Sequence, residues 1–346
     1  MESIQKMLLL CGEWFSRTGV PLPWRETRDP YRIWISEIML QQTRIETVIP
    51  YYDRFLRAVP DVFRLAALPD ETLYKLWEGL GYYSRARNLK KCAGILCSRY
   101  QGAFPRTAKE LETLPGIGAY TAGAIASIAF GEPSPAVDGN VLRVFTRVFA
   151  REDDVAKPQT RKEVSSLLAA HYPSGKKAGE VTEGLMEIGE RCCLPNGAPL
   201  CDACPLSGIC LSKDGLWRRL PVKSPKKERR IEEKTVFLLF CGGKVALEKR
   251  GESGLLAGLY GFPAADGRLD PKEAASYLLS RDLPFHSLSP CGSARHIFTH
   301  VEWRMTGFRA SLEAPSPAFC WADPDELERV YALPSAFRAF RKMVKK

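Results

Sequence analysis

The chain of 346 residues is 45% hydrophobic and has a formal net charge of +10. A single core rarely grows to this size, so we expect two domains. No run of apolar residues approaches the ~18 that cross a bilayer, which argues against a membrane-spanning protein. The apolar stretch 7–11 is too short and too poorly flanked to be a secretion signal.

The excess positive charge is concentrated in one short segment. Residues 216–231 hold seven basic and one acidic side chains, whereas the chain on either side is nearly balanced. Prolines and charges indicate a linker, which either follows a phosphate backbone or is a solvated tether. The predicted boundaries are therefore 1–215 and 232–346, with the linker 216–231 between them.

The first predicted helix covers residues 3–17, and a rigid turn with Trp24 and Arg25 follows it. Asp29 and Pro30 are then typical of a helix start, with Asp at the cap and Pro in the first turn.

Glu37 lies within an apolar run of this second helix. An apolar setting pushes a carboxyl group toward its protonated form, and such a group can act as a general acid near neutral pH. The alternative is a structural carboxylate held by hydrogen bonds. Gln41 lies four residues on, so it is expected to share the face of Glu37, and Gln42 and Thr43 add polar groups at the same place.

Residues 79–87, GLGYYSRAR, form a glycine turn followed by aromatic and arginine side chains. This mixture suits stacking on bases and contact with phosphates, or else a helix start with tyrosines in the core. Further helices are predicted over 87–100, 107–114, 157–172 and 177–191, which makes the first 215 residues wholly helical.

A hairpin between two helices is predicted at residues 114–118, LPGIG. Pro115 ends the incoming helix, and Gly116 and Gly118 allow a tight turn. The following helix, 119–130, presents N-terminal amides that suit a phosphate oxygen. Asp138 comes after a proline-rich loop, so a carboxylate is held near an anion-binding turn. This indicates chemistry on a nucleic acid, although an ordinary helix-turn-helix with an Asp cap fits equally well.

Four of the eleven cysteines are close together in CCLPNGAPLCDACPLSGIC, at 193, 201, 204 and 210. Their spacing differs from the paired CxxC of a zinc ribbon, and it suits an iron–sulfur cluster better than zinc or free thiols. Cys192 competes with Cys193 for the first ligand position. The remaining cysteines are interpreted as small apolar residues in a reducing compartment.

The pattern changes after the linker to a mixture of strands and helices. Two strands, 235–241 and 244–248, are predicted around Gly242 and Gly243, a helix over 271–280, and strands within 297–312.

Six segments in this order are highly specific: LPWR, WISEIMLQQT, GLGYYSRARNL, LPGIGAYTAGAI, VDGNVLRV and the cysteine loop. The chain resembles the adenine DNA glycosylases of the helix-hairpin-helix superfamily. The resemblance implies an all-α helix-hairpin-helix domain with an iron–sulfur loop, then an α+β Nudix-like domain. It also implies base excision repair, in which adenine opposite 8-oxoguanine or guanine is flipped out of double-stranded DNA and hydrolysed from its sugar without strand cleavage.

The resemblance also implies roles for individual residues. Glu37 protonates adenine and Asp138 stabilises the cationic sugar, with Tyr120 and Asn140 in support. Six residues contact DNA: Arg25, Gln41, Gln42, Tyr82, Gly116 and Gly118. Three contact the lesion opposite adenine: Phe298, Thr299 and His300. Four hold a 4Fe–4S cluster: Cys193, Cys201, Cys204 and Cys210.

Two departures from the family pattern bear on these roles. The first two cluster cysteines are separated by seven residues where six are usual, and Thr299 stands where serine is usual. The stretch 270–282 has only Glu273 where a Nudix hydrolase carries several glutamates, so a binding module is expected there.

We expect a monomer in the bacterial cytoplasm near the nucleoid, or in the nucleus or mitochondria of a eukaryote.

Two other functions remain in competition. An endonuclease III-like glycosylase with lyase activity would carry a lysine in the helix after the hairpin, where this chain has Tyr120. The third function is of another class: the missing Nudix glutamates oppose a nucleotide-pool hydrolase, and the presence of Glu37 and Asp138 opposes a DNA-binding protein that has lost catalysis.

Overall fold

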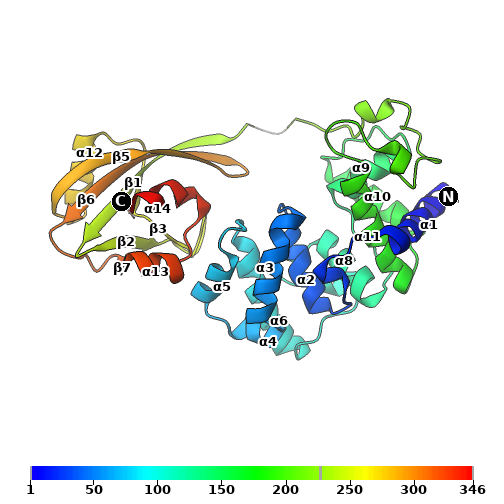
Figure 1. Cartoon of the computed structure of the whole chain (residues 1–346), viewed down its shortest axis with the longest axis horizontal. Coiled ribbons are helices and arrows are strands. Elements are labelled where there is room, and N and C mark those ends of the chain that lie inside the picture. Colours follow the sequence, from blue (N-terminus) through cyan, green and yellow to red (C-terminus); the bar gives the residue numbers. More distant parts are fainter. Residues whose placement is uncertain (1, 226–227, 345–346) are drawn as a thin grey trace. The chain divides into compact units, whose positions relative to one another are not determined.

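The computed structural model describes residues 2–225 and 228–344, so linker residues 226 and 227 lie outside the described part. The chain divides into two compact units (Figure 1). The first comprises Met1–Ala67 and Asn88–Pro225, and the second comprises Leu68–Arg87 and Lys226–Lys346. The short segment Leu68–Arg87 therefore groups with the C-terminal residues, and the predicted domain boundaries stay a prediction.

Every regular element described before residue 230 is helical, as the sequence predicts. None of the helices in the described ranges is long and apolar enough to span a bilayer. The α-helices of the first unit are α1 (Glu2–Thr18), α2 (Pro30–Leu40), α3 (Ile45–Ala58), α4 (Val62–Ala67), α6 (Ser84–Tyr100, begun in the second unit), α7 (Ala108–Leu111), α8 (Ala119–Phe130), α9 (Gly139–Val148), α10 (Pro158–Ala169) and α11 (Lys176–Arg191). Short 3-10 turns lie at Pro23–Arg25, Cys201–Ala203 and Leu216–Arg218.

Side-chain caps explain where two functionally important helices begin. Asp29 caps α2 by accepting from the backbone N–H of Tyr31, and Pro30 occupies the first turn, as predicted. Asp138 caps α9 in the same way, by accepting from the N–H of Val141. Gly131 ends α8 in the left-handed conformation with φ of 71°. The capping residues thus fix both the start of α9 and the carboxylate of Asp138.

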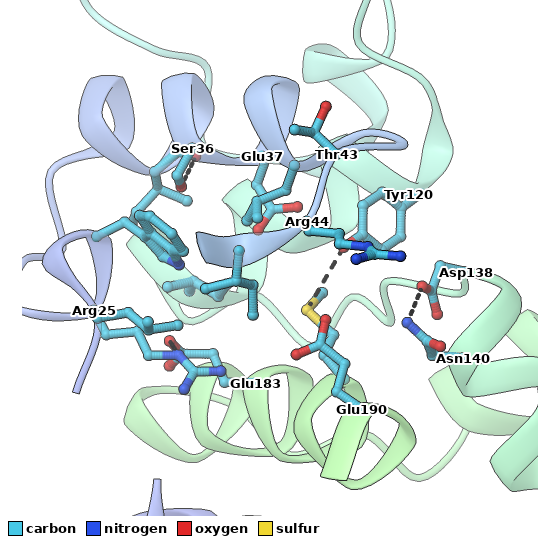
Figure 2. Close-up of a pocket in the computed structure, with 17 residues that line it drawn as sticks. Arg25, Ser36, Glu37, Thr43, Arg44, Tyr120, Asp138, Asn140, Glu183 and Glu190 are labelled. Atoms are coloured by element: carbon cyan, nitrogen blue, oxygen red, sulfur yellow. Dashed lines mark hydrogen bonds and ion pairs between the residues drawn. The ribbon is translucent and has the colours of Figure 1, made fainter. Parts of the chain in front are cut away.

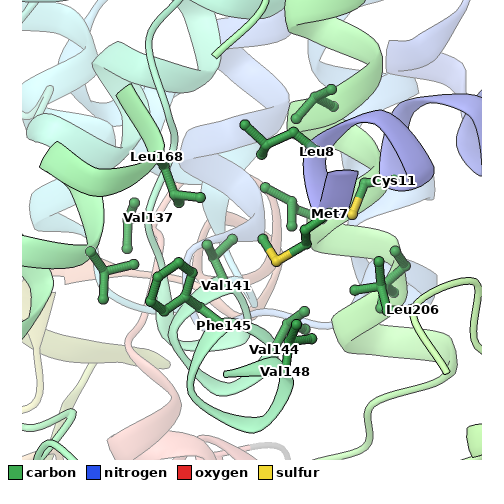
Figure 3. Close-up of a cluster of buried hydrophobic side chains, with 14 of the residues drawn as sticks. Met7, Leu8, Cys11, Val137, Val141, Val144, Phe145, Val148, Leu168 and Leu206 are labelled. Carbon is green, nitrogen blue, oxygen red and sulfur yellow. The ribbon is translucent and has the colours of Figure 1, made fainter. Parts of the chain in front are cut away.

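The core of the first unit holds α9 in place (Figure 3). Helices α1, α9, α10 and α11 all contribute buried side chains to it, and Cys192 and Leu206 extend it to the cysteine loop. Phe145 and Leu142 of α9 are almost completely buried. Each such side chain stabilises the fold by about 1.5–3 kcal/mol, so the N-terminus of α9 is set on a rigid base.

The second unit is built on a seven-stranded sheet. The central order is β3-β2-β1-β6-β5, with β4 paired to β1 and β7 paired to β2. Strands β1 and β6 are parallel, and the other pairs are antiparallel. The strands are β1 (Arg230–Cys241), β2 (Lys244–Lys249), β3 (Tyr260–Gly261), β4 (Ala264–Asp266), β5 (Phe285–Ile297), β6 (Val301–Leu312) and β7 (Cys320–Ala322), and the helices are α5 (Asp70–Trp77), α12 (Pro271–Ser280), α13 (Pro324–Arg329) and α14 (Arg338–Val344), with a 3-10 turn at Ser335–Phe337.

Both faces of this sheet are covered, which explains the apolar run in β1. Val236 and Leu238 face a core with α13 and α14, whereas Phe237 and Leu239 face a core with α12. Alternate side chains of a strand point to opposite faces, so β1 must be apolar on both. The predicted hairpin between β1 and β2 is confirmed, with Phe240 paired to Val245 and positive φ at Gly242 and Gly243.

The first part of the predicted linker is folded against the first unit. Leu220 is buried, and its carbonyl accepts a hydrogen bond of 2.9 Å from Nε of Arg147. The N–H of Val155 donates to the carbonyl of Val222 at 3.0 Å. Strand β1 already begins at Arg230. The chain is thus attached to the first unit at Leu220 and Val222 and joins the sheet at Arg230, and the choice between a phosphate-binding segment and a tether stays open.

Candidate active site

One cavity of about 160 Å³ in the first unit collects the residues for which the sequence predicts catalysis (Figure 2). Glu37 reaches it from α2, Tyr120 from α8, and Asp138 and Asn140 from the start of α9. Helix α11 closes the opposite side with Glu183, Met186 and Glu190. The structure thus assembles four predicted residues from three segments that are far apart in the sequence.

Glu37 is buried and its side chain faces this cavity. Burial raises the pKa of the Glu37 carboxyl to about 7, helped by the negative charges of Glu183 and Asp138. A hydrogen bond from Tyr120 and the charge of Arg25 oppose the rise. A carboxyl group with this pKa is about half protonated at pH 7 and can deliver a proton there.

Asp138 has a more polar setting than Glu37. Its Oδ1 accepts from the N–H of Val141 at 2.8 Å, and its Oδ2 accepts from Nδ2 of Asn140 at 3.0 Å. Burial raises the pKa of Asp138, but backbone hydrogen bonds and the charges of Arg143 and Arg161 oppose it. The helix N-terminus also favours a negative charge at this place. Asp138 is therefore arranged to present a carboxylate.

Asn140 and Tyr120 are each held in one orientation. Nη2 of Arg143 donates to Oδ1 of Asn140 at 2.8 Å, which leaves the Asn140 amide to face Asp138. The Tyr120 hydroxyl donates to Sδ of Met186 at 3.6 Å and lies beside Glu37. Burial raises the pKa of Tyr120 well above its ordinary value, so this hydroxyl stays protonated.

Three charged residues that line the cavity, Arg44, Glu183 and Glu190, were not singled out by their sequence context, whereas Arg25 was a predicted DNA contact. Nε of Arg25 lies 3.4 Å from Oε1 of Glu183, and its Nη1 lies 2.5 Å from Oε2 of Glu187. Glu190 and Arg44 line the cavity as well. Arg25 and the glutamates are about 160 residues apart, and only the packing of α11 beside the turn at Pro23–Arg25 brings them together.

Gln41 is the capping residue that directly follows α2, which ends at Leu40. Its φ of −56° is helical, and its ψ of 109° turns the chain after it and not its own side chain, so the face shared with Glu37 stays a prediction. Its Nε2 donates to Oγ1 of Thr121 at 3.3 Å. Gln42 has a positive φ of 59°. Thr43, by contrast, lines the cavity as expected.

The predicted helix-hairpin-helix is present between α7 and α8. Gly116 has φ of +79°, and an added Cβ would lie 2.6 Å from Cβ of Asn88, so only glycine fits. Gly118 is the N-cap of α8, and nothing lies within 4 Å of a Cβ added there. The turn thus leaves open space around Gly118 at a helix N-terminus, which is a favourable place for a phosphate oxygen.

The cysteine loop surrounds a small apolar cavity of about 30 Å³. Its lining includes Cys192 and the four predicted ligands, Cys193, Cys201, Cys204 and Cys210. Nη1 of Arg147 donates to Sγ of Cys193 at 3.4 Å, and the backbone carbonyl of Cys193 accepts from Nε of Arg143 at 2.8 Å. Among the described residues, no three His, Cys, Asp or Glu side chains are already arranged to hold a metal ion. The donor set is nevertheless that of a thiolate-ligated centre.

The second unit has a larger cavity, of about 470 Å³, beside the turn between β5 and β6. Phe298, Thr299 and His300 line it together with Tyr82. The N–H of Phe298 closes the turn on the carbonyl of Val301 at 2.8 Å. The hydroxyl of Tyr82 lies 3.2 Å from Oγ1 of Thr299, within hydrogen-bonding distance.

Glu273 has a structural role in the second unit. Its carboxylate accepts from the N–H of Asp270, and Asp270 caps α12 in return, which forms a capping box. Because this carboxylate serves the helix end, α12 offers no cluster of glutamates of the kind that binds magnesium in a Nudix hydrolase.

Comparison with known proteins gives the family. Residues 35–170 match the model of the HhH-GPD superfamily of base excision DNA repair proteins, and residues 235–343 match that of the NUDIX domain. The adenine DNA glycosylase of Rattus norvegicus is 32% identical over 88% of this chain and 70% of its own length. That of Buchnera aphidicola subsp. Baizongia pistaciae is 37% identical over 83% of this chain and 81% of its own.

The chain belongs to the adenine DNA glycosylase family. It is a DNA glycosylase, and the predicted combination of a helix-hairpin-helix domain with a Nudix-like domain is confirmed. Among solved structures, a thermostable thymine-DNA glycosylase is similar over 62% of this chain and 97% of its own, with a TM-score of 0.56 and 30% identity. An endonuclease III in a non-covalent complex with DNA is similar over 63% and 98%, with a TM-score of 0.53 and 27% identity.

Membership of the adenine DNA glycosylase family shows that the macromolecule bound by this chain is DNA. Glycosylases of this family bind DNA, and so does the similar endonuclease III. The nucleotide-pool hydrolase is not supported, because the Nudix-like part of this glycosylase uses its one helical glutamate as a cap.

Proposed function

We propose that the chain hydrolyses the N-glycosidic bond of adenine paired with 8-oxoguanine or guanine in double-stranded DNA. The observation that carries the proposal is the pair of carboxyl groups in one cavity of a glycosylase fold. Glu37 has a pKa of about 7, and Asp138 accepts two hydrogen bonds at the start of α9. A base within a duplex is out of reach, so the adenine nucleotide must first be flipped into the cavity.

Glu37 then acts as the general acid. Its proton passes to a ring nitrogen of adenine, for which N7 is the accessible choice, and this makes the base a better leaving group. The C1′–N9 bond breaks, and its electron pair leaves with the base. The sugar becomes oxocarbenium-like, and the Asp138 carboxylate stabilises the positive charge. Water adds to C1′, and its proton returns to the Glu37 carboxylate, so the acid is regenerated.

We propose that this glycosylase does not cleave the strand. Cleavage by a lyase needs an amine that forms a Schiff base with the sugar. Tyr120 occupies the first turn of α8, and no lysine is found among the described residues that line the cavity. Tyr120, whose hydroxyl is kept protonated by burial, lies beside Glu37 instead.

The base opposite adenine would be recognised by the second unit. The cavity beside Phe298, Thr299 and His300 is wide enough for a base edge and offers a hydroxyl and a histidine ring. Thr299 keeps the hydroxyl of the usual serine, and its contact with Tyr82 supports a use in hydrogen bonding. The preferred partner in this interpretation is 8-oxoguanine.

We further propose that Cys193, Cys201, Cys204 and Cys210 hold a 4Fe–4S cluster. Their thiols face one apolar cavity, and the guanidinium of Arg147 beside Cys193 suits a negatively charged centre. Such a cluster supplies no step of base excision, and its effect would be to order the cysteine loop and the chain that follows it for DNA binding. All eleven cysteines are free, in keeping with a reducing compartment such as the bacterial cytoplasm, the nucleus or mitochondria.

Single-turnover assays with the full chain test the reaction. We expect removal of adenine from A:8-oxoG and, more slowly, from A:G, and no removal of thymine from T:G. Strand breaks should appear only after treatment with alkali. Glu37→Gln protein is the matched control for a contaminating glycosylase. Strand breaks without alkali would show a lyase, and intact adenine in every duplex would refute the proposal.

A further inference from the structure

Glu78, directly after α5, accepts hydrogen bonds from its own neighbourhood in the chain and from the C-terminal part of the sequence. Its Oε1 accepts from Nη1 of Arg341 at 2.7 Å and from the N–H of Leu333 at 3.3 Å. Its Oε2 accepts from Nζ of Lys75 at 2.6 Å. Lys75 also donates to the carbonyl of Tyr331 at 3.3 Å. The side chains of Glu78 and Arg341 are only 20% and 25% exposed, so this pair is better shielded from water than a surface ion pair.

The turn that follows Glu78 is under backbone strain. Gly79 and Gly81 have positive φ, and so does Tyr82, at 48°, which is costly for a residue with an aromatic side chain. Arg85 braces the turn from inside by donating to the carbonyls of Leu80 and Gly81. A strained turn keeps its shape only if its surroundings hold it, and Glu78 provides the attachment at its base.

The same carboxylate also joins two of the segments that line the cavity in the second unit. One wall consists of residues 81–84 and Arg87, which begin three residues after Glu78. Another wall is formed by Pro334 and Ser335, which directly follow the Leu333 N–H that Glu78 accepts. At the far end of the turn, the hydroxyl of Tyr82 reaches across the cavity to Thr299, and Tyr82 is 47% exposed.

We propose that the Glu78–Arg341 pair is a positioning device for reading the base opposite adenine. It sets the spacing between the Tyr82 turn and the Phe298–His300 turn, so that the hydroxyls of Tyr82 and Thr299 are presented together. Neither Glu78 nor Arg341 touches DNA in this interpretation. The inference rests on the proposed recognition of 8-oxoguanine and adds residues that set its selectivity.

Variants of Arg341 test the inference, because they remove one partner of the ion pair and leave Glu78 in place. Arg341→Met keeps the aliphatic length and removes the charge, whereas Arg341→Lys keeps a charged donor. Glu71→Gln is the matched control, because Glu71 of α5 pairs with Lys249 of β2 at 3.2 Å, away from α14, with both side chains nearly half exposed. Thermal unfolding identifies any variant that fails to fold.

Two ratios are measured for each full-length protein. The first is the single-turnover rate for A:8-oxoG over A:G. The second ratio compares two dissociation constants for duplexes that carry an uncleavable abasic analogue in place of the adenine nucleotide. The Kd of the duplex with guanine opposite the analogue is divided by the Kd of the duplex with 8-oxoguanine opposite it. This ratio reports recognition of the opposite base independently of base excision. Arg341→Met should lower both ratios by about tenfold, the loss of roughly one good base contact. Arg341→Lys should restore them to within about threefold of wild type, and Glu71→Gln should leave them unchanged.

The inference would be overturned if a folded Arg341→Met protein kept both ratios within about twofold of wild type, since loss of one base contact changes such a ratio by more than twofold. An equal fall in Glu71→Gln would overturn it as well, because any loosening of the segment would then suffice. Absence of adenine excision by wild type on every duplex would refute the proposed function instead, and the binding ratio would still test the role of Arg341.

Discussion

Replacing Glu37 by Gln should abolish excision and, at the same time, stabilise the protein at alkaline pH. Burial raises the pKa of Glu37 from 4.5 to about 7, so the folded state holds a proton that the unfolded state releases near pH 4.5. Stability is therefore full below pH 4.5 and is lost as the pH rises through 7. The loss amounts to about 3 kcal/mol at pH 8 and less than about 1 kcal/mol at pH 5.

Gln has the shape of the protonated acid and never ionises, so it avoids this loss. Glu37→Gln should thus unfold at a temperature roughly 6–12 °C above wild type at pH 8, with a much smaller difference at pH 5. Its excision rate should fall by about 10²–10⁴-fold, the usual contribution of a general acid. Thermal unfolding and single-turnover excision at both pH values provide the measurements.

The pH profile of the wild-type rate completes this test. The rate should be level below pH 7 and fall about tenfold per pH unit above it, as the acid form of Glu37 is depleted. At the ordinary pKa of 4.5, only about 0.3% of the acid would remain at pH 7, a loss of about 150-fold relative to half protonation. A variant that excises adenine normally, or that gains no stability at pH 8, would refute the reasoning.

Asp138→Asn should preserve the cap of α9, because Asn is also a good N-cap. The single-turnover excision rate should nevertheless fall by about 10²–10³-fold, and thermal unfolding shows whether the variant is folded. Cys204→Ser should remove a yellow-brown absorption near roughly 400 nm and weaken DNA binding, whereas colourless wild-type protein with stoichiometric zinc would refute the cluster. Thr299→Val, which loses the hydroxyl and keeps the shape, should lower the preference for A:8-oxoG over A:G by about 5–150-fold, whereas Thr299→Ser should keep it.

Local signals predicted much of the fold and part of the site. The glycines of the hairpin, the caps at Asp29 and Asp138 and the turn at Gly242 act over a few residues, so their structural consequences can be read from the sequence. The burial of Glu37 was visible as a carboxylate in an apolar run.

Ion pairs between residues that are far apart in the sequence could not be predicted. Arg25 meets Glu183 and Glu187 only because α11 packs beside the turn that carries it. Glu78 meets Arg341, some 260 residues away, for the same kind of reason. Neither pair has a local pattern, because an isolated charge in a helix is usually solvated. The sequence held one indication of buried ion pairs: α11 carries an excess of glutamates, although its other face is apolar.

The two carboxyl groups of the candidate site differ because their surroundings differ, and this difference assigns their roles. Glu37 has burial as its largest influence and two negative neighbours, which together favour the protonated form. Burial is the largest influence on Asp138 too and raises its pKa, but two N–H donors, the start of α9 and two arginines oppose that rise and support its charged form. A proton donor and a negative charge are what departure of a base from a sugar requires on its two sides. Because the negative charge of Asp138 also raises the pKa of Glu37, removing that charge should lower the pKa of the acid and shift the pH profile to lower values.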